Sequence, residues 1–310
     1  MVRFVVDPAT LARLQRRNRL ETALSLAALV ALAAAIGWLA AGADGLIVGA
    51  AMMGAGLAFG ALPAEVVFQQ GFGAIRLTPF AAPGLFALVD ELSRRAGLAV
   101  APNLYLLPQP VLQAVAAGST EKPGIGVTRA LVETLKPAEL AGVLAHEVSH
   151  IRHGDLMVMR LAAQASAITR AMAQAGLIVL VLWGSGAVGA HPLLPALLVV
   201  APLLSDLLAL SLSRTREFLA DAGAVELTGD PYGLSSALLT LERLQGDDFE
   251  RLASRGPRWL RLFRTHPTIA ERVAALREAS VMVRPALPVW TGSPWGDAPL
   301  LPRRRLPWHR

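Results

Sequence analysis

The chain has 310 residues, of which 54% are hydrophobic and only 17% are charged. Its mean hydropathy is +0.49, so it is not a disordered chain, and it does not fit a typical soluble domain, in which about 25% of residues are charged. Cysteine is absent, which excludes disulfide scaffolds and iron–sulfur clusters, and any metal site must use histidines and carboxylates.

An uncharged apolar run at residues 22–41 follows a basic N-terminus at 1–21. In a helix this run spans roughly 30 Å, the thickness of the hydrocarbon core of a bilayer. A second uncharged run at 45–64 begins after a short turn at 42–44. The two runs predict a transmembrane hairpin over 22–68, and we expect it to be retained because the first run is too long for a signal peptide. A pair of buried helices in a soluble protein is the alternative.

The next part of the chain changes between helical and extended patterns. Residues 82–97 have helical periodicity between a proline and a glycine, which are start and stop signals. Short apolar runs predict strands at 103–107, 112–118 and 124–128. A longer helix is predicted over residues 137–160, because a proline is favoured in the first turn of a helix.

A second pair of apolar runs, at 171–189 and 193–212, predicts another hairpin over 171–212. The glycines and prolines in and between these runs are tolerated in membrane helices. A re-entrant hairpin, or one that lies on the membrane surface, is the alternative. Asp206 lies in the second run, and an ionisable residue there is also compatible with a transporter. Four spans beside a large soluble part argue against that function.

Three further helices are predicted at 214–227, 232–244 and 267–278. From Ser280 the chain is rich in proline and tryptophan and then in arginine, and we expect 281–310 to be a loosely ordered tail on the membrane or on the soluble domain. That domain has a first part at 76–165 and a second part at 213–280. The predicted fold class is an α+β membrane protein, with a mostly α-helical domain, a small β-sheet and two transmembrane helical hairpins.

Basic residues border the apolar runs and are missing within them. The net charge is +6, yet no Lys or Arg occurs between Arg19 and Arg76 or between Arg170 and Arg214. By the positive-inside rule, both termini and the soluble domain lie on the cytoplasmic side of the cell (inner) membrane, in a multi-pass protein. The basic flanks can contact anionic lipid of the bilayer. Because the arginines follow the membrane boundaries, the charge does not indicate a nucleic-acid partner.

An HExxH motif, His146-Glu147-Val148-Ser149-His150, lies within the predicted helix 137–160. Positions i and i+4 of a helix lie on one face about 6 Å apart, so two imidazoles can bind one zinc ion. Glu147 lies to the side, where it can reach a water molecule beside the metal. Two surface histidines beside a salt-bridged glutamate are the alternative. His153 lies beside the ligand face and is expected to be a polar neighbour.

A catalytic zinc site has three protein ligands and one open position, so a third ligand is needed. Glu217 is the candidate, because it lies in a predicted helix just after the second hairpin. Asp221 lies one turn further and can accept the free ring N–H of a zinc-binding histidine. Surface ion pairs of these carboxylates with Arg214 and Arg216 are the alternative.

These segments resemble the HtpX-type membrane-bound zinc metallopeptidases, relatives of the CAAX prenyl endopeptidases with a gluzincin-type HExxH…E site. The similarity covers about residues 80–280 and both hairpins, with matching segments at 94–97, 104–107, 139–150, 153–155, 213–221 and 265–267. The resemblance implies a zincin-type catalytic domain, one Zn²⁺ per chain, Glu217 as third ligand and Asp221 as the partner of a zinc histidine. It also implies a zinc metalloendopeptidase for damaged or misfolded membrane proteins.

The chain departs from this family in the strand before the HExxH helix. The family has an Asn-Ala-Phe-Ala type sequence there, whose backbone binds extended substrate, whereas this chain reads QAVAAG from Gln113. Backbone pairing needs no particular side chain, so we still expect the protein or peptide substrate to bind as an extended strand. The change to Gln113 affects the contact made by the family Asn side chain, and with it the cleavage preference.

The predicted reaction is peptide-bond hydrolysis with Glu147 as the general base. Glu147 takes a proton from the attacking water and later delivers it to the leaving amine. His266 is a candidate donor to the oxyanion, and a cap on the helix that follows it is the alternative role. A catalytically inactive zinc-binding membrane adaptor or scaffold is the alternative for the whole chain. The sequence predicts neither the physiological substrate nor the oligomeric state.

Overall fold

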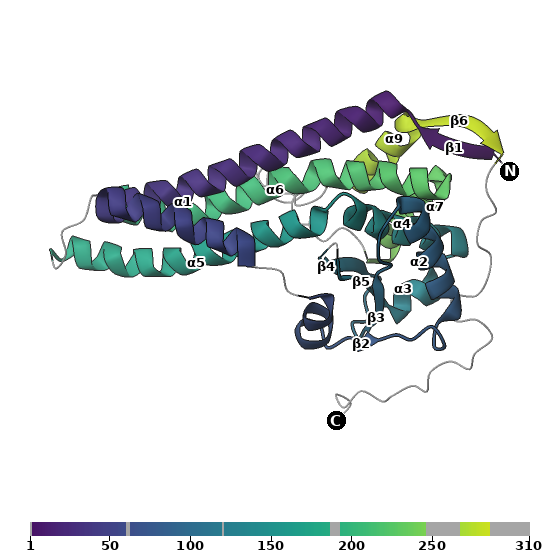
Figure 1. The fold of residues 1–310 in the computed structure, drawn as a ribbon, viewed down its shortest axis with the longest axis horizontal. Coiled ribbons are helices and arrows are strands. Elements are labelled where there is room, and N and C mark those ends of the chain that lie inside the picture. The colour runs from purple at the N-terminus through teal and green to yellow at the C-terminus, as the bar shows by residue number, and fades with distance from the viewer. Residues whose placement is uncertain (1, 60–62, 120, 187–192, 246–266, 286–310) are drawn as a thin grey trace.

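The computed structural model describes residues 2–59, 63–119, 121–186, 193–245 and 267–285. Figure 1 shows an elongated molecule, in which long helices extend from a compact part made of shorter helices and a small sheet. The predicted combination of many helices with a small β-sheet is therefore confirmed, and the structure shows that this sheet is mixed.

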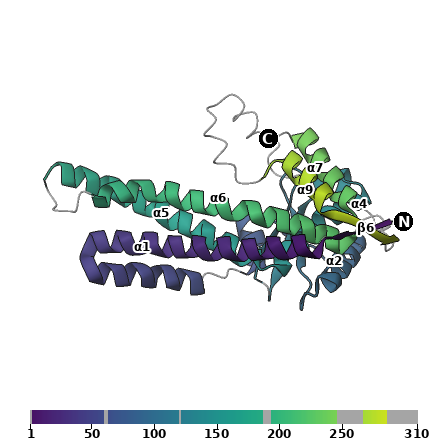
Figure 2. The same ribbon diagram turned by 90° about the horizontal axis from the view of Figure 1, so that it is seen from above.

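The first long helix, α1 (Pro8–Phe59), folds back on itself. Its backbone leaves the helical region at Ala41 and at Gly42, where φ is 62°, so the turn lies where the two apolar runs were predicted to separate. Glycine adopts this left-handed conformation without the steric cost of a Cβ atom. The two arms lie side by side in Figure 2.

Small residues bring the backbones of the two arms of α1 into contact. A Cβ atom on Gly37 would lie 2.0 Å from the carbonyl oxygen of Gly45, and one on Gly49 would lie 2.5 Å from that of Ala33. On each arm the two small residues are four positions apart. This spacing is typical of helix pairs in membranes, where close backbone packing replaces the hydrophobic effect as a source of association.

Within the described residues, one helix is long and apolar enough to cross a membrane, namely Pro8–Ala51. Its most apolar window has a mean hydropathy of 2.2 and is only 17% buried, which does not fit the core helix of a soluble protein. In the second pair of apolar runs, Leu193–Leu204 is a shorter apolar helix. Among the described residues, one membrane-compatible helix is thus present, and the two transmembrane hairpins stay a prediction.

The second hairpin is formed by α5 (Asp155–Gly184) and α6 (Leu193–Thr228), which pack against each other and against α1. The sequence predicted that the second apolar run ends at residue 212 and that a separate helix begins at 214. This boundary is wrong, because α6 is continuous through the region. No proline or glycine interrupts it between Pro202 and Gly223. The backbone of Asp206 lies in α6, and its side chain is outside the described part of the structure.

The helix predicted over 137–160 is two helices, α4 (Pro137–Arg152) and α5. The break is at Gly154, whose φ of 72° ends α4 and turns the chain before Asp155. The prediction followed the apolar periodicity through this point and gave too little weight to a glycine that terminates helices in the left-handed conformation. As described below, this break determines where the Asp155 carboxylate lies.

Four strands form the sheet of the compact part, in the order β2-β3-β5-β4. Their bounds are β2 (Ile75–Arg76), β3 (Asn103–Leu107), β4 (Ala114–Gly118) and β5 (Pro123–Thr128). The two central strands, β3 and β5, are parallel to each other. β2 pairs antiparallel with β3, and β4 pairs antiparallel with β5. The three predicted strands are thus confirmed. β2 and β4 are the two edge strands of this sheet, and β4 faces the site described below.

The core of the compact part surrounds α4, which is buried along most of its length. It packs against α6 and against α2 (Pro83–Ala96) and α7 (Pro231–Gln245). Two glycines make these contacts close. A Cβ atom on Gly142 would lie 2.7 Å from the backbone nitrogen of Leu234, and one on Gly223 would lie 2.1 Å from Oγ of Ser149. The helix that carries the HExxH motif is therefore fixed between α6 and α7.

The remaining elements join the two ends of the described chain. Strand β1 (Val2–Val6) pairs antiparallel with β6 (Ser280–Pro285), which follows α9 (Ile269–Ala279). The loosely ordered tail was expected from Ser280, so its first residues differ from the prediction and form a strand, while 286–310 lie outside the described residues. Two shorter helical segments are η1 (Val66–Gly71) and α3 (Arg129–Thr134).

Candidate metal centre

The HExxH helix is held at both of its ends. Pro137 occupies the first turn of α4, and the backbone N–H of Lys136 donates to the Glu139 carboxylate at 2.9 Å, which satisfies a donor at the helix start. At the other end, Gly154 turns the chain away. Between these ends, the side chains of His146 and His150 emerge on one face of α4, toward α6.

Three potential metal ligands meet between α4 and α6. His146, His150 and Glu217 are all buried, and each offers one ligand atom such that these atoms lie within 4.8 Å of one another. The two Nε2 atoms are 3.1 Å apart. Oε2 of Glu217 lies 3.5 Å from Nε2 of His146, and Oε1 of Glu217 lies 3.9 Å from Nε2 of His150. The structure thus brings the three predicted ligands together.

The donor set fits a small tetrahedral ion. At metal–ligand bonds of about 2.0–2.1 Å, tetrahedral ligand atoms lie roughly 3.3 Å apart. The 3.1 Å between the two Nε2 atoms and the 3.5 Å from His146 to Oε2 of Glu217 are close to this value. Two imidazole nitrogens and one carboxylate oxygen are ligands typical of catalytic zinc, with one position left open. All three candidate ligands are buried, two on α4 and one on α6.

Each histidine has its own carboxylate at the opposite ring nitrogen. Nδ1 of His146 lies 2.9 Å from Asp221, and Nδ1 of His150 lies 2.9 Å from Asp155. When Nδ1 carries the proton and donates it to a carboxylate, Nε2 is left with a free electron pair that points at the site. Asp221 was predicted in this role, whereas Asp155 was not.

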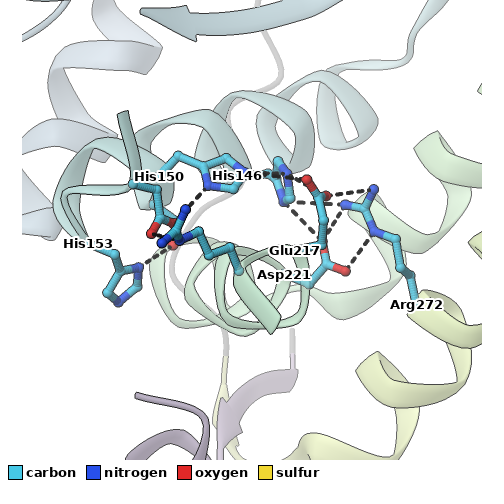
Figure 3. A network of polar contacts seen from close by, with 9 residues as sticks. His146, His150, His153, Glu217, Asp221 and Arg272 are labelled. Atoms are coloured by element: carbon cyan, nitrogen blue, oxygen red, sulfur yellow. Dashed lines mark hydrogen bonds and ion pairs between the residues drawn. The ribbon is translucent and has the colours of Figure 1, made fainter. Parts of the chain in front are cut away.

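Arg272 of α9 connects the carboxylates on the other side of His146 (Figure 3). Its guanidinium forms a two-pronged contact with Asp221 and lies 3.2 Å from Glu217. Burial raises the pKa of Asp221, but the charge of Arg272 and the contact with His146 outweigh this effect. The pKa of Asp221 is therefore lower than its usual value, and this carboxyl stays ionised. The planar guanidinium suits such paired contacts better than a lysine would.

The electrostatics of the site favour positive charge between the ligands. Burial lowers the pKa of His146, but its hydrogen bonds to Asp221 and Glu217 outweigh that effect and raise the pKa to about 10. A protonated imidazole cannot coordinate a metal, so metal binding must release this proton. The carboxylates that stabilise the proton are the same groups that would stabilise a divalent cation.

A cleft of about 430 Å³ opens beside the ligands. The half-buried Glu147 lines it together with the three ligands and Arg272, and residues 113–116 at the start of β4 form one wall. Apolar side chains line much of the remainder, among them Leu112, Leu131, Val143, Leu234, Leu238 and Leu241. Glu147 is therefore close to the open side of the candidate metal site.

Other predicted residues have different outcomes. His153 contacts Oγ of Ser149 at 3.2 Å and takes no part in the ligand set, as expected of a polar neighbour. His266 lies outside the described residues. Three residues that the structure brings to the site were not predicted for it, namely Asp155, Arg216 and Arg272. Asp155 follows a His-Gly pair that signals a helix break, whereas the two arginines carry no local signal.

Three features together define a metallopeptidase. They are an HExxH motif on a helix, a carboxylate from a second helix as the third candidate ligand, and a glutamate at the adjoining cleft. Residues 81–280 match peptidase family M48, and the chain therefore belongs to that family. It is a metalloendopeptidase, and the prediction of an HtpX-type peptidase is confirmed.

The similar proteins include a "Protease HtpX homolog" of Acidiphilium cryptum, 36% identical over an alignment of 280 residues that covers 84% of this chain and 96% of the relative. A "Protease HtpX" of Legionella pneumophila is 33% identical over 287 residues, covering 84% of this chain and 98% of the relative. Among solved structures, S. mikatae Ste24p matches 74% of this chain with a TM-score of 0.43 and 18% identity, and the chain spans 55% of that protein.

Proposed function

We propose that this chain is a zinc-dependent endopeptidase of the cell membrane, which hydrolyses peptide bonds in protein substrates on the cytoplasmic side. The observation that carries the proposal is the convergence of His146, His150 and Glu217 within 4.8 Å, beside Glu147 in a cleft. The donor types and the open position favour one Zn²⁺ per chain. Zinc bound there would act as a Lewis acid and would acidify a water molecule.

The residues of the chain then supply the proton transfers. Glu147 takes a proton from the attacking water as general base and returns it to the amine that leaves. His146 and His150 are kept in one ring orientation by Asp221 and Asp155, which lie 2.9 Å from their Nδ1 atoms. His266, as in the sequence-based prediction, is the proposed hydrogen-bond donor to the developing oxyanion.

The proposed substrate site is the open edge of β4. Gln113 pairs with Thr128, since the N–H of Thr128 donates to its carbonyl at 2.9 Å. The backbone hydrogen-bonding groups of successive residues in a strand point to alternate sides. Since Gln113 bonds to β5, the backbone groups of Ala114 and Ala116 point away from β5, toward the cleft that these residues line. An extended peptide can add there as a further strand, with its scissile bond near Glu147. Gln113 also lines the cleft, which supports its effect on cleavage preference.

The membrane arrangement is proposed from charge and apolarity. The apolar helix Pro8–Ala51 supports a membrane-associated protease. The exclusion of Lys and Arg from the apolar regions supports two hairpins with both termini and the catalytic part in the cytoplasm. A site in this position is suited to chains that are damaged or misfolded in the membrane, and we propose quality control of such proteins as the physiological role.

The topology predicts opposite locations for two reporters. A reporter fused after Arg310 is expected to be active in the cytoplasm, and one inserted at Asp44, next to the turn of α1, is expected on the far side. Insertion at Asp230, in the loop between α6 and α7, provides the cytoplasmic control. The same location for the reporters at Asp44 and Arg310 would contradict the first hairpin.

The activity predicts metal-dependent cleavage of an unfolded protein. The full chain, purified in detergent, is expected to cleave casein when loaded with zinc, to lose this activity with a chelator and to regain it when zinc is restored. Added Mg²⁺ is the matched control, because it prefers oxygen ligands and octahedral geometry and should not restore cleavage. Stoichiometric zinc without cleavage of casein or of membrane proteins would instead indicate the inactive adaptor.

A further inference from the structure

A fully buried arginine lies next to the metal centre without touching the ligand atoms. Arg216 precedes Glu217 in α6, and only 2% of its side chain is exposed. Its Nε lies 3.2 Å from the carboxylate of Asp155, and its Nη2 donates to Oγ1 of Thr22 at 2.8 Å. Removing a guanidinium from water is costly unless its charge is balanced, and Asp155 balances it by electrostatic attraction, since Nε of Arg216 makes no hydrogen bond within the described residues.

The Asp155 carboxylate is shared between this arginine and a metal ligand. Oδ1 of Asp155 faces Arg216, whereas Oδ2 lies 2.9 Å from Nδ1 of His150. Only 1% of the aspartate side chain is exposed, so water does not compete for either oxygen. The charge of Arg216 attracts Oδ1 across 3.2 Å without a hydrogen bond from Nε to that oxygen, and this attraction favours the carboxylate orientation in which Oδ2 meets the His150 ring.

The far side of Arg216 reaches the first long helix. Thr22, at the start of the apolar run of α1, donates its own hydroxyl proton to the carbonyl of Asn18 at 2.7 Å, so its oxygen is free to accept from Arg216. Glu21, the preceding residue, also attracts Arg216 electrostatically. A continuous path of contacts therefore runs from α1 through Arg216 and Asp155 to His150.

The two histidines are supported in the same way from opposite sides. The carboxylate behind His146 is held by Arg272 of α9, and the carboxylate behind His150 faces Arg216 of α6. Figure 3 shows the first of these sets, with Glu217 and Asp221 between His146 and Arg272. The second set differs in two respects, because its arginine faces the carboxylate without a hydrogen bond to it from Nε and also contacts the helix that is apolar enough to cross a membrane.

We propose that Arg216 is a positioning residue, which orients His150 through Asp155 and makes the geometry of the metal site depend on the docking of α1. The inference rests on the proposed function only in taking His150 as a metal ligand. Its consequence is that a change at Thr22, on a helix that supplies no ligand, alters how the metal is bound.

The test measures metal binding by the full chain in detergent, independently of peptidase activity. Affinity for Zn²⁺ is measured by competition with a chelator, and the coordination geometry is followed by the visible absorption of the Co²⁺-loaded protein. The variants are Arg216→Met, Asp155→Asn and the double variant. Arg214→Met is the matched control, because Arg214 lies two residues earlier in α6 and is exposed.

We expect Arg216→Met and Asp155→Asn each to weaken Zn²⁺ binding by about 10- to 100-fold and to alter the Co²⁺ spectrum, while Arg214→Met leaves both unchanged. Because the two residues act in series, the double variant should lose about as much as the larger single loss. Wild-type affinity and spectrum in folded Arg216→Met protein, or losses that multiply in the double variant, would overturn the proposal.

A milder variant guards against a failure to fold. Thr22→Val keeps the shape of the side chain and removes its hydroxyl, which accepts from Arg216 and donates to the carbonyl of Asn18 within α1. We expect about 2- to 10-fold weaker Zn²⁺ binding and an altered Co²⁺ spectrum. An unchanged spectrum and affinity would overturn the link to α1. Wild-type protein that binds zinc but cleaves nothing would contradict the proposed function and leave this inference standing, whereas wild-type protein without zinc affinity would contradict both.

Discussion

The Glu147→Gln variant should fold and bind metal like the wild type and should cleave substrate at least about 10²- to 10⁴-fold more slowly, the usual range for general acid–base assistance. Glutamine has the size of glutamate and fits a helix equally well, but it cannot take a proton. Glu147 lines the cleft without belonging to the ligand set, so the metal should be retained. In the proposed mechanism, Glu147 serves both proton transfers, which is why the expected loss is large.

The measurement combines three readouts on the same preparation: metal content, the far-UV circular dichroism spectrum and the initial rate of casein cleavage. Glu133→Gln supplies the matched control, because it makes the same chemical change on the neighbouring helix α3 at an exposed side chain. Cleavage at the wild-type rate by Glu147→Gln would refute the proposed role. Loss of the metal would reassign Glu147 as a ligand or as a structural support.

The ligand set could be predicted because the HExxH spacing is a property of the helix itself. His146 and His150 are four positions apart, so any α-helix brings their side chains to one face, whatever the rest of the fold. Glu217 could be proposed only as a candidate, since its approach depends on how α6 packs on α4. That packing relies on Gly223, whose missing side chain lets the helices meet at Ser149.

The partners of the ligands were harder to predict, because they depend on breaks and contacts that are distant in sequence. In one continuous helix, Asp155 would be rotated roughly 140° from His150, away from its Nδ1 atom. The left-handed Gly154 between them allows the carboxylate to return to the ring, and the uninterrupted helix that was predicted hid this contact. Arg272 lies 51 residues after Asp221, and no periodicity connects the two.

The long helices show a related limit of sequence reasoning. Charge gaps and apolar runs predicted the hairpin of α1 and its turn near Gly42, because both follow from local composition and from the conformational freedom of glycine. The same patterns predicted a boundary near residue 212 that α6 does not have. Apolarity ends there, but helical propensity continues, so a change of environment was mistaken for the end of a helix.

The Glu217→Gln variant should lose metal affinity and peptidase activity together. The amide oxygen that replaces the carboxylate is neutral and is a far weaker ligand for a divalent cation, and it no longer balances the charge of the ion. We expect a loss beyond the roughly 10- to 100-fold range for a residue that only supports a ligand. Arg272 keeps its two-pronged contact with Asp221, so the fold should survive the change.

Asp221→Ala provides the comparison that separates a ligand from its support. It removes the acceptor at Nδ1 of His146 and leaves all three ligand atoms in place, so affinity should fall only within the range of roughly 10- to 100-fold. Glu226→Gln is the matched control for charge, because Glu226 lies on the same helix and pairs with Arg152, away from the site.

Zinc that binds only the folded chain stabilises it by RT ln(1 + [Zn²⁺]/Kd), so the rise in unfolding temperature at one zinc concentration ranks the affinities of the variants. The wild type and Glu226→Gln should be stabilised most, Asp221→Ala less, and Glu217→Gln hardly at all. Competition with a chelator then gives the affinities directly. Full zinc affinity in Glu217→Gln would show that another carboxylate completes the site, and the proposed arrangement of α4 and α6 around one metal ion would have to be abandoned.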